Sequence, residues 1–210
     1  MKVFEIYQKF TTPPNLQEHM FRVASVALFI VDHWEGPEID KDLIIKSALV
    51  HDLGNIVRLD LKGHPEFLGK EADNIDFWAK KQQEMIEKYG LDDHQATAKM
   101  LKEIGLKNKL VELVLRKGFK SSLDIEKSGN WELKIILYAD MRVGPFGIMS
   151  LANRLEEVLN RLLGADKGKW NTHVEACKRI EKEIQKNLDT NLQKITDKSL
   201  KKEDFLSLEI

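Results

Sequence analysis

The stretch Ala48-Leu49-Val50-His51-Asp52-Leu53-Gly54-Asn55 carries three aliphatic residues directly into an imidazole and a carboxylate. Apolar residues recur at intervals of three and four before it, which predicts a helix over residues 40–53. Asp40 is placed to cap this helix, and Gly54 is placed to end it. A His-Asp pair alone is weak evidence of a site, because a buried histidine is more often simply hydrogen-bonded.

Two other predicted helices carry comparable polar groups beside their apolar faces. His19 lies in the amphipathic segment 16–31, and Asp140 ends the strongly apolar run 135–139. Burying an isolated imidazole or carboxylate is costly, so buried groups of this kind are normally paired or bound to a metal. Mixed nitrogen and oxygen ligands suit Mn, Fe, Co, Ni, Zn or Mg without selecting one of them. The sequence therefore predicts a divalent metal site with these ligands: His19, His51, Asp52 and Asp140.

Helical periodicity extends along most of the 210 residues, of which 42% are hydrophobic and 32% charged. This pattern predicts an all-α fold, with a long loop at 55–71 and a second loop at 121–130. We expect helices over residues 16–31, 40–53, 72–89, 93–104, 107–117, 131–141, 148–163 and 172–195. Residues 1–165 form the predicted metal-binding domain, and residues 166–210 a C-terminal helical extension packed on it. The last helix leaves room for a homodimer contact.

Composition excludes several classes of protein. Cys177 is the single cysteine, so the chain has neither a disulfide framework nor a thiolate metal cluster, and it fits a reducing cytoplasm. No window approaches the roughly 18 consecutive apolar residues of a membrane span, and the N-terminal residues do not resemble a secretory signal. A formal net charge of -1, with both signs well mixed, lacks the basic excess of a nucleic-acid surface. We expect a cytoplasmic protein that binds neither membrane nor nucleic acid.

The order His, then His-Asp, then Asp, each on its own helix, resembles the HD-domain superfamily of metal-dependent phosphohydrolases. The segments that carry the resemblance are 19–24, 49–55 and 138–142, and the similarity extends over roughly residues 15–160. The resemblance implies an HD-type helical bundle. It also implies that His19, His51, Asp52 and Asp140 all bind the same metal ion.

The chain also departs from that family. Many members have further histidines for a second metal, and segment 93–101 resembles the helix that supplies the first of them, His94. Segment 115–119, where the next is expected, has no histidine, and His64 comes earlier in the chain than the pattern requires. One divalent ion is therefore favoured over two, with a second near His94 or His64 left open. Some related nucleotidases follow His-Asp with a glutamate, whereas segment 53–58 has no acid and offers Asn55 instead.

The resemblance implies metal-assisted hydrolysis of a small phosphate ester, such as a nucleotide or a related phosphorylated metabolite. A bound metal would lower the pKa of a water molecule and polarise the phosphoryl group. Asp52 or Asp140 could orient that water and accept its proton, and His94 is the first candidate for a proton shuttle. His64 and Asp60 are the other candidates.

Phosphate also needs cationic and hydrogen-bonding partners, and the guanidinium group matches its geometry well. The expected substrate-binding residues are Arg22, Asn55, Arg58 and Arg142. Two functions of other classes stay open: a non-catalytic domain that binds a metal or nucleotide, and an oxygenase that uses two iron ions in the same fold.

Overall fold

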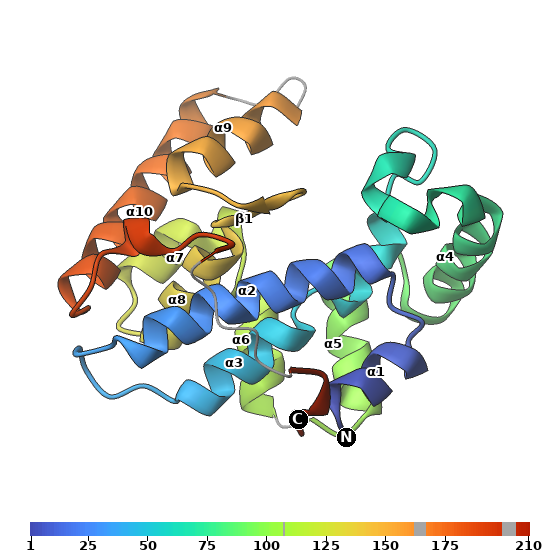
Figure 1. Cartoon of the computed structure of the whole chain (residues 1–210), viewed down its shortest axis with the longest axis horizontal. Coiled ribbons are helices and arrows are strands. Elements are labelled where there is room, and N and C mark those ends of the chain that lie inside the picture. The colour runs from blue at the N-terminus through green and yellow to red at the C-terminus, as the bar shows by residue number, and fades with distance from the viewer. Residues whose placement is uncertain (107, 162–166, 199–204) are drawn as a thin grey trace. The chain divides into compact units, whose positions relative to one another are not determined.

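A computed structural model describes residues 1–106, 108–161, 167–198 and 205–210 (Figure 1). Its α-helices are α1 Val3–Lys9, α2 Pro14–Asp32, α3 Lys41–Val50, α4 Ile75–Tyr89, α5 Asp93–Glu103, α6 Asn108–Arg116, α7 Ser122–Lys127, α8 Trp131–Asp140, α9 Leu151–Arg161 and α10 Lys167–Lys186. Short 3-10 helices are η1 Leu53–Arg58, η2 Pro65–Asn74, η3 Phe119–Ser121, η4 Leu192–Lys194 and η5 Phe205–Ser207. Strands β1 Val143–Gly144 and β2 Gly147–Ile148 pair in antiparallel fashion. The all-α prediction is confirmed.

The helix boundaries differ from the prediction where helices are short. The expected loop 55–71 contains most of η1 and η2, the expected loop 121–130 contains α7, and α1 was not predicted. The last long helix ends at Lys186 and not near residue 195, because the side chain of Gln185 binds the backbone after the turn. Its amide donates to the Thr190 carbonyl at 2.7 Å and accepts from the Leu192 N–H at 2.9 Å. These bonds satisfy backbone groups that a continuing helix would have paired.

The described chain divides into two units that are discontinuous in sequence. The first comprises Met1–Phe21, Leu49–Leu115 and Asp204–Ile210, and the second comprises Arg22–Ala48 and Arg116–Glu203. The predicted division near residue 165 stays a prediction. Every helix in the described ranges is too short or too polar to cross a lipid bilayer.

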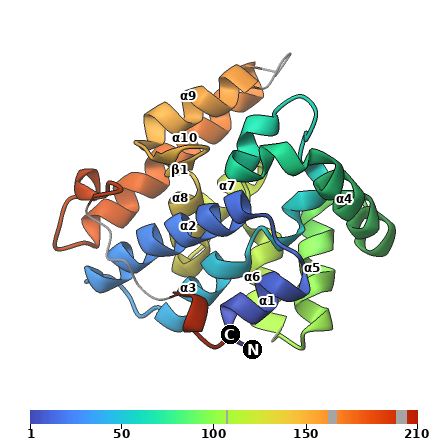
Figure 2. The ribbon, with the colours of Figure 1, turned by 45° about the vertical axis from the view of Figure 1, so that its right-hand side comes forward.

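The ends of the chain meet within the first unit. The Val3 N–H donates to the Leu208 carbonyl at 3.0 Å, and Lys2 pairs with Glu209 in an isolated antiparallel bridge. The two termini accordingly lie side by side in both views of the ribbon (Figures 1 and 2). The residues at the two ends therefore stabilise each other.

η1 is held between α4 and α5 of the first unit. Gln82 of α4 donates to the Ile56 and Leu59 carbonyls, both at 2.8 Å. Ile56 and Val57 are themselves buried. The segment that follows His51-Asp52 is therefore fixed by both backbone bonds and apolar packing.

The second unit is organised around α8, of which residues 133–139 are all buried. α10 packs against α7 and α8 (Figure 1). Lys134 pairs with Glu183 of α10 at 2.6 Å, and the Tyr138 hydroxyl donates to Glu181 at 3.0 Å. These contacts fix α8, whose last residue is Asp140.

Candidate metal centre

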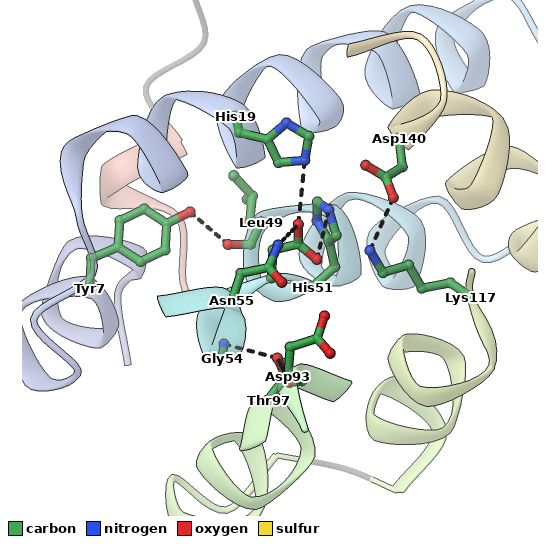
Figure 3. A network of polar contacts seen from close by, with 11 residues as sticks. Tyr7, His19, Leu49, His51, Gly54, Asn55, Asp93, Thr97, Lys117 and Asp140 are labelled. Carbon is green, nitrogen blue, oxygen red and sulfur yellow. Dashed lines mark hydrogen bonds and ion pairs between the residues drawn. The ribbon is translucent and has the colours of Figure 1, made fainter. Parts of the chain in front are cut away.

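His51 directly follows α3, whose last four residues, 47–50, are all buried. Leu49 and Val50 have no exposed surface, and His51 is 2% exposed. The Tyr7 hydroxyl donates to the Leu49 carbonyl at 2.6 Å, as Figure 3 shows. Burial raises the pKa of Tyr7, so the phenol stays neutral and remains a donor. This bond satisfies one of the carbonyls that a helix end leaves without an intrahelical partner.

The chain changes direction at Asp52, between α3 and η1. Its φ of -119° and ψ of 21° are non-helical. Gly54 then comes very close to α5, where its N–H donates to Thr97 Oγ1 at 2.9 Å and that hydroxyl donates to the Asp93 carbonyl at 2.8 Å. A Cβ at Gly54 would lie 2.5 Å from the Asp93 carbonyl oxygen and 2.5 Å from the Thr97 nitrogen. Glycine is required here because two backbones approach without room for a side chain.

The Asp52 carboxylate lies between two imidazoles. His19 Nε2 is 3.5 Å from Oδ2 and His51 Nε2 is 3.4 Å from Oδ1. Asn55 Nδ2 donates to Oδ2 at 2.6 Å (Figure 3). The two rings lie 5.3 Å apart between centroids at an angle of 55°. Both Nε2 atoms thus face one carboxylate, whose orientation the Asn55 amide holds.

Exposure differs among these three side chains. The His51 side chain is fully buried, whereas those of His19 and Asp52 are 19% and 15% exposed. One face of the group is therefore accessible to water and to a small solute. Partial access of this kind distinguishes a catalytic metal site from a closed structural one.

Asp140 is the C-terminal residue of α8 and is paired with a buried lysine. Lys117 Nζ lies 3.1 Å from Asp140 Oδ2, with side-chain exposures of 4% for the lysine and 20% for the aspartate. The sequence prediction missed Lys117, although a signal was present. Lys117 follows Leu110 by seven residues and Val114 by three, so it continues the buried face of α6.

The four residues predicted from the sequence form a group whose side chains could hold a metal ion: His19, His51, Asp52 and Asp140. The donor atoms are two imidazole nitrogens and two carboxylate oxygens. This set fits a first-row divalent metal and lacks the thiolates that would select a soft ion. The residues present therefore fit the kind of ion that the sequence predicted.

His94, the predicted proton shuttle, is the second residue of α5 and is half-buried. It does not belong to the metal-competent group among the described residues. The two other shuttle candidates lie in a local turn. His64 pairs with Glu66 at 3.0 Å, and Asp60 accepts the Gly63 N–H at 2.9 Å. Of the three, His94 belongs to the helix that packs on the turn after Asp52.

Two predicted substrate-binding arginines are paired with carboxylates and partly open to water. Arg22 Nε lies 3.5 Å from Asp197 Oδ1, and the Arg22 side chain is 26% exposed. Arg58 Nη1 lies 3.2 Å from Asp93 Oδ1, and the Arg58 side chain is 66% exposed. Exposed ion pairs of this kind contribute only about 0–1 kcal/mol, so either guanidinium can exchange its partner for a phosphate at low cost.

Arg142 has a different environment, because it is buried with 2% exposure. Its guanidinium donates to the Tyr138 hydroxyl at 2.6 Å and to the Ile195 and Leu192 carbonyls at 3.0 and 3.3 Å, and Nε donates to the Met149 carbonyl. These bonds join α8, the segment after β2 and η4 within the second unit. Arg142 therefore has a structural role, and we leave it out of the proposed substrate contacts.

Comparison with known protein families gives a match over the segment that contains the four predicted metal ligands. The sequence model of the HD domain family matches residues 16–142. This range begins three residues before His19 and ends two residues after Asp140, so it includes all four predicted ligands. No curated protein and no solved structure matches the chain.

Proposed function

Because the chain belongs to the HD domain family, we propose that it is a metal-dependent phosphohydrolase acting on a small phosphate ester. The substrate class is a nucleotide or a related phosphorylated metabolite. The observation that carries the proposal is the donor set of two imidazoles and two carboxylates, at the positions that bind a metal in the similar family. A domain without chemistry would have less reason to keep four ligands from three separate segments of the chain.

The ligands are His19, His51, Asp52 and Asp140, and the proposed ion is a single divalent metal: Mn, Fe, Co, Ni, Zn or Mg. When bound, such an ion acts as a Lewis acid on a phosphoryl oxygen and lowers the pKa of water. Metal binding requires neutral imidazoles and charged carboxylates.

Asp52 and Asp140 are the proposed residues that orient the attacking water and accept its proton. Asn55 donates to Asp52 Oδ2, which fixes how the carboxylate faces the reacting atoms. His94 is the proposed proton shuttle to the leaving group. Its helix is bonded through Thr97 to Gly54, two residues after Asp52, so its position is coupled to that of the metal ligand.

Arg22 and Arg58 are the proposed phosphate-binding cations, and Asn55 the proposed neutral donor. Both arginines pair with carboxylates, Asp197 and Asp93, in partly exposed ion pairs that a phosphate could displace at low cost. A guanidinium presents paired N–H donors that match two phosphate oxygens. A substrate with a terminal phosphate suits this arrangement.

A cytoplasmic location fits the state of Cys177. The side chain is buried, and burial raises its pKa to about 11, so it is an inert thiol. We also propose that the protein acts without a membrane or nucleic-acid partner, and that the exposed charged face of α10 is available for contact with a second copy.

Phosphate release from a panel of nucleotides and sugar phosphates, with Mn²⁺ or Co²⁺ present, tests the proposal. We expect release from at least one member, loss of release in His51→Ala, and retention in His33→Ala. His33 is a suitable control because it is half-exposed and pairs with Asp189 at 3.0 Å on the second unit. A bound metal with no release from any substrate would favour the non-catalytic domain, and two bound irons would favour the oxygenase.

A further inference from the structure

Two segments outside the matched family domain contact the parts of the chain that carry the histidine ligands. The family model covers residues 16–142, whereas α1 precedes it and the segment 205–210 follows it. Both segments belong to the first unit, as do His19 and His51. The family resemblance therefore assigns no role at the site to either segment.

Tyr7 of α1 contacts the end of α3. Its hydroxyl donates to the Leu49 carbonyl at 2.6 Å, two residues before His51 (Figure 3). Tyr7 and Leu49 are 2% and 0% exposed, so bulk water does not compete for this bond. Without the hydroxyl, a carbonyl at a buried helix end would lose that donor. The bond therefore helps to fix the end of α3, which His51 directly follows.

The ring of Tyr7 contacts α2 as well. It lies 5.6 Å from the Phe21 ring between centroids, at an interplanar angle of 54°. Phe21 follows His19 by two residues, and side chains two residues apart on an α-helix point about 160° apart. Phe21 therefore packs on the face of α2 that is turned away from His19. A contact on that face holds the helix without occupying the side on which the imidazole lies.

Phe205 packs against the same side chain of α2. Its ring stacks on that of Phe21 at 6.3 Å between centroids and 14° between planes, and Phe205 is 8% exposed. The segment that begins with Phe205 is also bonded to α1, where the Val3 N–H donates to the Leu208 carbonyl at 3.0 Å. Val3 precedes Tyr7 by four residues, so both lie on one face of α1. These contacts hold α1, and with it Tyr7, in place.

We propose that Tyr7 and Phe205 are positioning residues that hold His19 and His51 in the arrangement a metal ion requires. Tyr7 is the shared member, since its hydroxyl bonds the helix before His51 and its ring packs on the helix that carries His19. This inference rests on the proposed function, because it takes both histidines as metal ligands. It gives α1 and the segment 205–210 a role in metal affinity.

The test measures the Mn²⁺ affinity of metal-stripped protein, from the electron paramagnetic resonance signal of the unbound ion. Tyr7→Phe removes one hydroxyl and keeps the ring, and we expect it to bind Mn²⁺ about tenfold more weakly. Phe205→Leu removes the stacked ring and keeps an apolar side chain, and we expect a similar loss. Both variants should keep the helical circular dichroism of the wild type, so that unfolding does not account for the weaker binding.

Tyr89→Phe is the matched control for Tyr7→Phe. Tyr89 belongs to the same unit and is 4% exposed, and its hydroxyl donates to Glu103 at 2.7 Å. The substitution therefore removes a hydrogen-bonded hydroxyl from another buried tyrosine. We expect it to leave Mn²⁺ affinity unchanged even where it lowers the melting temperature. Weaker binding in Tyr7→Phe alone would separate positioning of the ligands from general stability.

Linkage supplies a second readout, which uses the unsubstituted chain. If the contacts of segment 205–210 with α1 raise Mn²⁺ affinity about tenfold, bound Mn²⁺ must favour those contacts by the same factor. The Val3 N–H, which donates to Leu208, should then exchange with deuterium about tenfold more slowly in saturating Mn²⁺. Nuclear magnetic resonance follows this amide. A purely structural role would leave its exchange rate the same with and without the ion.

Three results would overturn the inference: unchanged Mn²⁺ affinity in folded Tyr7→Phe, equal weakening in Tyr89→Phe, or exchange of the Val3 amide that Mn²⁺ does not slow. The exchange measurement decides the case if the substituted chains do not fold. Failure of the proposed function looks different, because the chain would show these affinity differences and release no phosphate from any substrate. A wild type that bound no Mn²⁺ would overturn both.

Discussion

Replacing Gly54 with alanine tests whether the turn after Asp52 positions the metal ligand. The added Cβ would lie 2.5 Å from the Asp93 carbonyl oxygen, 2.5 Å from the Thr97 nitrogen and 2.7 Å from Thr97 Oγ1. Two of these atoms belong to the backbone of α5, so they cannot rotate away as a side-chain tip could. The turn or the helix must move by about 1 Å to reach ordinary contact.

The cost can be worked from these contacts. Overpacking of a well-packed site costs about 1–3 kcal/mol, and loss of the Gly54–Thr97 hydrogen bond adds roughly 0.5–1.5 kcal/mol. We therefore expect Gly54→Ala to lower the free energy of unfolding by about 2–4 kcal/mol. Because Asp52 lies two residues before Gly54 and Asn55 directly after it, the same movement should weaken metal binding by about tenfold or more.

Urea denaturation and Mn²⁺ titration of the folded variant measure the two effects. Gly129→Ala is the matched control, because a Cβ at Gly129 meets no atom within 4 Å. Equal stability and equal Mn²⁺ affinity in the two variants would refute the reasoning that the close approach of η1 and α5 holds the ligand in place.

Three other predictions follow from single contacts. Asn55→Ala removes the donor to Asp52 Oδ2 and should weaken Mn²⁺ binding by about 10–100-fold, with an unchanged circular dichroism spectrum. Unchanged Mn²⁺ affinity would show that Asn55 does not orient the Asp52 carboxylate. Arg142→Met leaves buried carbonyl oxygens without donors and should lower the free energy of unfolding by about 3–5 kcal/mol, and a loss below 1 kcal/mol would contradict its structural role. The pKa of Cys177, about 11 in the fold, lies above its value in the unfolded chain, so at pH 8 the folded thiol should react with a disulfide reagent far more slowly than the urea-unfolded thiol. The stability that this shift contributes is present below the pKa of the unfolded thiol and is lost as the pH rises toward 11. Equal labelling rates for the folded and the unfolded protein would show that the thiol is accessible in the fold.

The long helices and the metal-competent residues were predictable because their signals are local. α2, α5, α6 and α8 carry apolar residues at helical spacing over nine residues or more, which is enough for the period to show. His51-Asp52 stands directly after such a run. The HD domain family model matches residues 16–142, which contain this motif, so the resemblance to that family is confirmed.

Contacts between distant residues were not predictable, because no local pattern encodes them. α1 has seven residues, too few for a clear period, and its pairing with the C-terminal residues depends on contacts across the whole chain. The position of Arg142, two residues after Asp140, predicts a substrate ligand, but its carbonyl partners at 192–195 lie about fifty residues later. Only the fold shows that this guanidinium is buried among backbone carbonyls.

The sequence carries a signal for the burial of Lys117. Its position continues the apolar face of α6, and a lysine on a buried face needs a partner. The sequence alone does not identify that partner as Asp140. The ion pair between Lys117, which directly follows α6, and Asp140 depends on the tertiary structure.

Metal content by mass spectrometry, for the wild type and for His51→Ala and Asp140→Ala, tests the central claim most directly. We expect about one divalent ion per wild-type chain, loss of most of it in both variants, and retention in His33→Ala, with helical circular dichroism preserved throughout. A full equivalent of metal in both ligand variants, or no metal in the wild type, would contradict it.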